Sequence, residues 1–146
     1  MVIPMAEIDA KGYLQQVERF ENLITAKLEE MDRLRALTTK ITSSWKDDVV
    51  SSSGNKDKLG DAIAKIIDLQ SEINETIDEY VDRKREVSSV LEKVENPNQL
   101  AVLTKKYLLF ESLEQIAFEM NMTYRNVCYI HGEALLAVDD LLKGET

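Results

Sequence analysis

The stretch Ser112–His131, SLEQIAFEMNMTYRNVCYIH, decides the fold of this chain. Ser112 with Gln115 three residues later is a capping box, which predicts the start of a helix. Asn121 tolerates the left-handed conformation of a tight turn, and Thr123 can cap a second helix. The apolar positions at helical spacing are Leu113, Ile116, Ala117, Met120, Val127, Ile130 and Ala134. The stretch therefore predicts two helices joined by a short turn, the helix-turn-helix arrangement that is typical of DNA-binding proteins.

The second helix of this motif carries the side chains expected to read DNA, because its N-terminal part enters the major groove in such proteins. Arg125 can bind guanine through two hydrogen bonds, and Asn126 can bind adenine if its place near the cap allows it. The two tyrosines can contact a phosphate or a thymine methyl group. The expected DNA-binding residues are Thr123, Tyr124, Arg125, Asn126 and Tyr129, with Lys105 and Lys106 of a preceding helix as contacts to the DNA backbone.

Three further residues of this region indicate a role less specifically. The lone cysteine, Cys128, is interpreted as a small packing residue. The only histidine, His131, fits a phosphate contact and helix packing equally well. Gly132 lies inside the expected helix, where glycine costs up to about 1 kcal/mol relative to alanine. This cost predicts a close packing contact at Gly132.

The same region carries a family resemblance. Residues Leu108–Leu136, LLFESLEQIAFEMNMTYRNVCYIHGEALL, resemble region 4 of sigma-70-type factors. They are most similar to small prophage proteins of Gram-positive bacteria related to the ArpU/RinA-type late transcription regulators, which share an Ile-Ala, Tyr-Arg-x-Val and Ile-His-Gly-x-Ala-Leu block. Thr38–Asn74 resembles the middle segment of that group, with Ser-Ser-Gly followed by Ala-x-Ala-Lys-Ile-Ile-Asp-Leu. The likeness covers roughly residues 10 to 140.

This resemblance implies a phage or prophage-type transcription regulator that binds the promoters of late genes, with RNA polymerase as a further partner. One position departs from the group's pattern. Glu133 stands where relatives often carry a basic residue, and an acid there weakens the case for a phosphate contact at that point.

Upstream of the motif, the apolar spacing predicts two long helices. The second has a heptad repeat, which is typical of a coiled coil. Its seam is Leu59, Ile63, Ile66, Gln70, Ile73, Ile77, Tyr80, Lys84, Val87, Leu91 and Val94. The first runs from Leu14 to Trp45 with a broader stripe, and the polar segment Lys46–Asp57 between the helices has the composition of a loop. Two such helices bury their apolar stripes most simply by packing together as an antiparallel hairpin. After the second helix, Asn96 can cap a further helix that begins at Pro97.

We therefore predict an all-α fold with a long N-terminal antiparallel helical hairpin, or coiled coil, followed by a small C-terminal helix-turn-helix domain. The expected domains are residues 1–95, for oligomerisation or protein contact, and residues 96–146, for DNA binding. We expect a homo-oligomer, with a dimer favoured.

Composition agrees with a cytoplasmic protein. With 146 residues the chain has about the length of one domain. A single cysteine excludes an internal disulfide and fits a reducing compartment. No apolar run reaches the roughly 20 residues of a membrane span, and no signal-peptide core is present.

The net charge of -9 is unusual for a DNA-binding protein. Residues 1–95 hold 14 basic and 20 acidic side chains, and residues 96–146 hold 4 basic and 7 acidic ones. Because phosphate neutralisation supplies most non-specific affinity, a lone C-terminal domain should bind DNA weakly. A second copy or a DNA-binding partner would have to supply the difference.

Enzymatic function is not expected, since the chain has no glycine-rich phosphate loop and no nucleophile with a suitable base. We expect no cofactor and no metal site. Two alternatives to the regulator remain. One is a small-terminase-like DNA-packaging subunit of a phage, although there the helix-turn-helix usually comes first. The other is a helix-turn-helix module that binds protein and not DNA, which the acidic charge favours.

Overall fold

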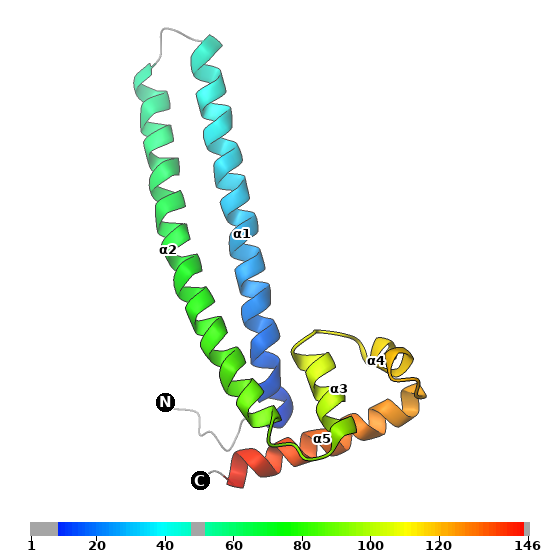
Figure 1. Ribbon diagram of the computed structural model, residues 1–146. Coiled ribbons are helices and arrows are strands. Elements are labelled where there is room, and N and C mark those ends of the chain that lie inside the picture. The colour runs from blue at the N-terminus through cyan, green and yellow to red at the C-terminus, as the bar shows by residue number, and fades with distance from the viewer. Residues whose placement is uncertain (1–8, 48–51, 145–146) are drawn as a thin grey trace. The chain divides into compact units, whose positions relative to one another are not determined.

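The chain is helical in a computed structural model that describes residues 9–47 and 52–144 (Figure 1). No strand occurs among these residues, which confirms the all-α expectation. The helices are α1 (Ala10–Asp47), α2 (Ser52–Leu91), α3 (Pro97–Tyr107), α4 (Leu113–Glu119) and α5 (Tyr124–Gly144).

The break between α2 and α3 follows from the Asn-Pro pair. The Asn96 side-chain oxygen accepts hydrogen bonds from the N–H groups of Asn98 and Gln99, at 2.9 and 3.1 Å. Pro97 occupies the first turn of α3, where its missing N–H costs nothing. The predicted cap at Asn96 is therefore confirmed.

The described residues divide into two compact units. The first unit comprises residues 9–19 and 80–144, and the second comprises residues 20–47 and 52–79. The expected boundary between residues 95 and 96 thus falls inside the first unit. The first turns of α1 and the last turns of α2 pack with the C-terminal helices, because they share one apolar core with them.

The main core of the first unit draws on four helices. Leu14 and Val17 of α1, Leu103 of α3 and Val138 of α5 are fully buried, and Leu91 of α2 is 1% exposed. The other buried members are Ala10, Tyr13, Val87, Val90, Val94, Tyr107 and Ala134. Segments more than 100 residues apart in the sequence therefore form a single cluster.

Carboxylates bind the start of α1 within this unit. The Ala10 N–H donates to the Asp139 carboxylate of α5 at 2.8 Å, and the Gly12 N–H donates to the Asp9 carboxylate at 2.7 Å. Negative charge is favourable at a helix N-terminus, where N–H groups lack partners within the helix. The bond between Ala10 and Asp139 connects the two ends of the described chain.

In the second unit, α1 and α2 lie side by side and run in opposite directions (Figure 1). Met31 of α1 packs on Leu69 and Ile73 of α2, and all three are buried. Beside them, the Lys27 ammonium lies 3.1 Å from the Glu72 carboxylate.

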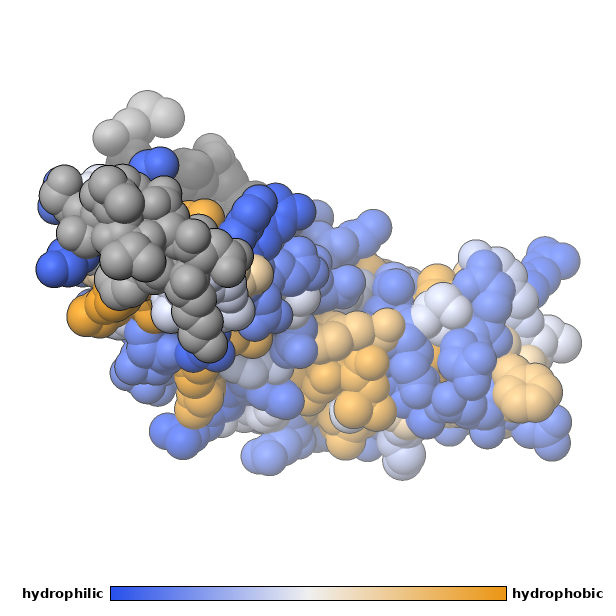
Figure 2. All heavy atoms as spheres, turned by 90° about the horizontal axis from the view of Figure 1, so that it is seen from above, coloured by the Kyte–Doolittle hydropathy of each residue, from blue (hydrophilic) through white to orange (hydrophobic). Residues whose placement is uncertain are grey.

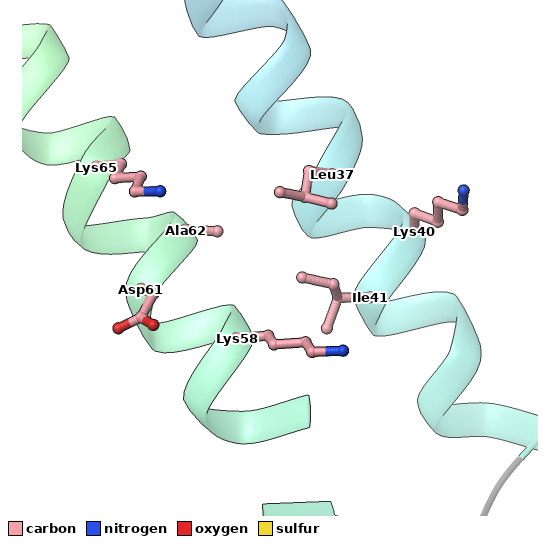
Figure 3. A pocket seen from close by; sticks show the side chains of 7 residues that line it. All are labelled: Leu37, Lys40, Ile41, Lys58, Asp61, Ala62 and Lys65. Atoms are coloured by element: carbon pink, nitrogen blue, oxygen red, sulfur yellow. The ribbon is translucent and has the colours of Figure 1, made fainter. Parts of the chain in front are cut away.

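Farther along the same two helices, the packing is open. Figure 3 shows Leu37 and Ile41 of α1 pointing toward α2, where Ala62 presents only a methyl group. A groove of about 470 Å³ results, because the small side chain leaves the space between the helices unfilled. Its polar lining consists of Lys40, Lys58, Asp61 and Lys65.

The structure corrects two predictions for α2. Part of the predicted seam is exposed to solvent, namely Ile63, Gln70, Ile77 and Lys84. In the second unit the buried line instead includes Ala62, Leu69 and Ile73. In addition, α2 begins at Ser52, so residues 52–57 are helical and not part of a loop. The rest of the predicted loop includes residues 48–51, which lie outside the described residues.

Apolar side chains also reach the surface, as the orange areas among the blue ones show in Figure 2. The largest exposed fractions belong to Phe118 at 82%, Tyr129 at 68% and Ile67 at 63%. These side chains lie on three different helices. None of the described helices is both long and apolar enough to cross a membrane.

The core of the first unit yields a stability prediction. Leu103→Ala should lower the free energy of unfolding by about 2–5 kcal/mol, because it leaves a cavity in a fully buried site. Leu136→Ala is the matched control on α5, where the leucine is 59% exposed and the change should stay within about 0.5 kcal/mol. Urea unfolding followed by circular dichroism measures both. Equal losses would contradict the assignment of the core.

Candidate nucleic-acid interface

Helices α4 and α5 are joined by a short turn, and each of them begins at a side-chain cap. The Ser112 hydroxyl accepts from the Gln115 N–H at 3.1 Å, and the Thr123 hydroxyl accepts from the Asn126 N–H at 3.1 Å. Asn121 has a φ of 59°, the left-handed conformation that the turn requires. The predicted caps and turn residue are confirmed.

The capping box at Ser112 is only half formed. In a complete box the Gln115 side chain would return to the Ser112 N–H. Instead, the Gln115 amide donates to the Glu119 carboxylate at 2.9 Å. The physical reason is that Glu119 lies one turn later on the same face of α4 and offers a charged acceptor, which forms a stronger hydrogen bond than a neutral one.

A small apolar cluster fixes α4 against α5. Ile116 and Ala117 of α4 pack on Val127 of α5 and on Val102 of α3, and all four are buried. The short side chain of Ala117 allows the two helices to approach closely. Leu113, Met120, Met122 and Ile130 surround this cluster.

The residues predicted to read DNA share the exposed side of the first two turns of α5 and its cap. Thr123, Arg125 and Asn126 are exposed, Tyr124 is 48% exposed and Tyr129 is 68% exposed. The Thr123 cap uses the Asn126 backbone N–H, so it does not involve the Asn126 side-chain amide. A hydrogen bond with the Cys128 side chain raises the pKa of the Tyr124 hydroxyl, and the electrostatic interaction with Cys128 raises it further.

The two lysines of α3 differ in their surroundings. The Lys105 ammonium lies 2.6 Å from the Glu119 carboxylate, and this contact raises the pKa of Lys105. Lys106 lies over the ring of Tyr107, 5.9 Å from its centre. A DNA phosphate that approached Lys105 would therefore compete with a carboxylate of the protein itself.

Glu119 is the centre of a small charged cluster. Hydrogen bonds from Lys105 and then from Gln115 lower its pKa to about 2. Burial, followed by a hydrogen bond with Glu119, raises the pKa of the nearby Glu111. Phe110, just before Glu111, has a φ of 60°, a backbone conformation that residues other than glycine rarely adopt. No sequence pattern predicts this cluster, because residues 105, 111 and 119 lie on separate segments.

Phe118 is an exposed aromatic residue of α4 that the sequence analysis did not single out. It is 82% exposed, although its neighbour Ala117 is buried. The helical spacing could have predicted this exposure. One residue corresponds to a rotation of about 100° around the helix, which places Phe118 outside the apolar face formed by Ile116 and Ala117.

The contacts of His131 and Gly132 in the middle of α5 can be compared with the predictions from the sequence. The His131 Nε2 lies 2.7 Å from the Tyr107 hydroxyl, and the two rings stack with centres 5.7 Å apart. His131 therefore takes part in helix packing. The close contact predicted at Gly132 is wrong, since a Cβ atom there would meet nothing within 4 Å. We have no packing reason for this glycine.

Burial of His131 yields a pH prediction. Burial, followed by the charges of Lys106 and Lys11, lowers the pKa of His131 below its ordinary value of 6.5. Protonation then favours the unfolded chain, so the contribution of His131 is fully present above pH 6.5 and is lost as the pH falls below it. A proton NMR titration of this only histidine should give a pKa below 6.5.

His131→Gln provides the control. In this variant the melting temperature should change less between pH 7.5 and 5.5 than in the wild type, because the group that titrates there is gone. A wild-type pKa at or above 6.5 would contradict the burial of the ring against Tyr107.

Among the described residues, no three His, Cys, Asp or Glu side chains come together as a metal site would require. Comparisons with curated proteins and with solved structures gave no match. A family model matches residues 40–139, which is more than half of the chain and includes α2, α3, α4 and most of α5. The chain therefore belongs to the family described as "Protein of unknown function (DUF1492)".

Proposed function

We propose that α4 and α5 form a helix-turn-helix of the sigma-70 region 4 type, and that the chain is a phage or prophage-type transcription regulator that binds promoter DNA. The observation that carries this proposal is the geometry of the turn. A capped α4, a left-handed Asn121 and a Thr123 cap place the start of α5 at the surface with its polar side chains exposed.

The roles of the exposed residues follow from their chemistry. Arg125 would bind the acceptor atoms of guanine, and the Asn126 amide would bind adenine. Tyr124 and Tyr129 would contact phosphate or thymine methyl groups, and Thr123 would contact the DNA backbone close to its cap. Lys106 would add a phosphate contact from α3, with Lys105 as a second one once its bond to Glu119 is broken.

Charge limits how a single chain could bind DNA. Residues 96–146 contain only 4 basic side chains against 7 acidic ones, and one of the basic groups is paired within the protein. We therefore expect that a second copy of the chain or RNA polymerase contributes to binding. In this proposal α1 and α2 form the helical hairpin, or coiled coil, that provides this association.

A helix-turn-helix module that binds protein is the second candidate. Phe118 favours it, because an aromatic ring that is 82% exposed on α4 is better suited to an apolar partner than to DNA. The Lys105–Glu119 pair favours it as well, since it removes a cation from the surface that phosphate would approach. DNA-binding measurements separate the two candidates.

Arg125 and Val127 provide a matched pair of substitutions on α5. Arg125→Ala should weaken specific DNA binding by about 1–3 kcal/mol and leave the fold intact, because the side chain is exposed. Val127→Asp should unfold the region around α4 and α5, because it places a charge at a fully buried site. Thermal melts and fluorescence titrations with promoter DNA measure the two effects. If both substitutions unfolded the protein, Arg125 would be structural.

Glu119 provides a second test. Glu119→Gln should release Lys105 to bind phosphate, and Glu114→Gln is the control because it removes a negative charge from the same helix without releasing a lysine. Glu119→Gln should bind DNA more tightly and should steepen the slope of log affinity against log salt by about one. Equal effects of the two variants would indicate net charge alone. No binding to DNA by any of these proteins, with or without polymerase, would favour the protein-binding module.

A further inference from the structure

Within the second unit, α2 carries two stripes that have coiled-coil spacing. The first is Ala62, Ile66, Leu69 and Ile73, with steps of four, three and four residues. Ala62, Leu69 and Ile73 are buried, and Ile66 packs against the cluster that contains Met31 of α1. This stripe is covered by α1.

The second stripe repeats the same spacing one residue later. It consists of Ile63, Ile67, Gln70, Asn74 and Ile77. One residue corresponds to about 100° around an α-helix, so this stripe lies on the flank of α2 beside the face that α1 covers. Ile63, Ile67 and Ile77 are 45%, 63% and 38% exposed, and both amide residues are exposed.

The single chain covers these isoleucines only in part, since 45%, 63% and 38% of Ile63, Ile67 and Ile77 stay exposed. Isoleucine has a branched side chain and is a poorer helix former than Leu, Lys or Glu. Three isoleucines on one line, with no charged residue among the five positions, have the pattern that is typical of a helix interface. The charged residues of this part of α2, such as Asp68, Glu72 and Glu75, occupy other positions.

The centre of the stripe is polar. The Gln70 amide donates to the Asn74 side-chain oxygen at 3.1 Å. A carboxamide has two N–H donors and an oxygen with two lone pairs, so both groups can form additional hydrogen bonds across an interface. Polar residues at such seam positions lower the affinity but fix the register and the number of helices.

We propose that this stripe, Ile63 to Ile77 of α2, binds a second copy of the chain and forms a homodimer. The partner helix must offer apolar side chains to the isoleucines and amide groups to Gln70 and Asn74. The stripe itself meets both requirements when a two-fold axis places it against its own copy. Because the stripe has no charge, the interface buries no ion. This inference follows from α2 alone and does not depend on DNA binding.

The test compares full-length variants by sedimentation equilibrium at concentrations from about 1 to 100 µM. The wild type should form a dimer in this range. Ile67→Lys should weaken the association by at least about tenfold, because it places a charge in the buried seam. The control is Ser89→Lys, which adds the same charge at an exposed position of α2 beyond the stripe. It should dimerise like the wild type.

A third variant tests the polar centre. Replacing Gln70 and Asn74 together by leucine should strengthen the association and change or broaden the oligomeric state. Circular dichroism should show all variants folded, because every changed residue is exposed. A monomeric wild type at 100 µM would overturn the proposal, as would an Ile67→Lys protein that dimerises like the Ser89→Lys control.

The result is separable from the proposed function, because sedimentation is measured without DNA. A dimer that does not bind DNA supports the interface and contradicts the regulator. A monomer that binds promoter DNA supports the regulator and contradicts the interface.

Discussion

The core of the first unit is the interaction on which the described structure depends most. Leu14 and Val17 near the start of α1 pack in one cluster with Val87 and Leu91 near the end of α2, and with residues of α3 and α5 such as Val138. Helices of this length are stabilised mainly by burial of an apolar face and not by local propensity. The cluster therefore supports the start of α1, the end of α2 and the base of the candidate DNA-binding region.

Helix α2 has more apolar surface than α1 can cover. In the second unit, α1 packs on the line through Leu69 and Ile73, while Ile63 and Ile67 remain exposed one residue further around the helix. A helix with two adjacent seams can hold two neighbours at once. This arrangement gives a physical basis for association of the chain that does not use the surface of α4 and α5.

Electrostatics shape the candidate interface as strongly as the turn does. The exposed side of α5 carries Arg125 and two tyrosines, but Glu119 of α4 binds Lys105 of α3. Such a pair between partly exposed groups adds little stability, yet it removes a cation from the surface. If this surface binds DNA as proposed, base contacts and partners would contribute more to binding than general attraction to phosphate.

The sequence by itself determined the local structure. The helical periodicity, the caps at Asn96, Ser112 and Thr123 and the turn at Asn121 were all readable, because each depends on residues within one or two turns of the chain. The tertiary structure decided everything that depends on distant partners. It chose which of two adjacent stripes of α2 faces α1, because alternative lines of the same repeat differ by only one residue. It also placed Lys105 against Glu119 and His131 against Tyr107, since no periodic pattern records which side chains from separate helices will meet.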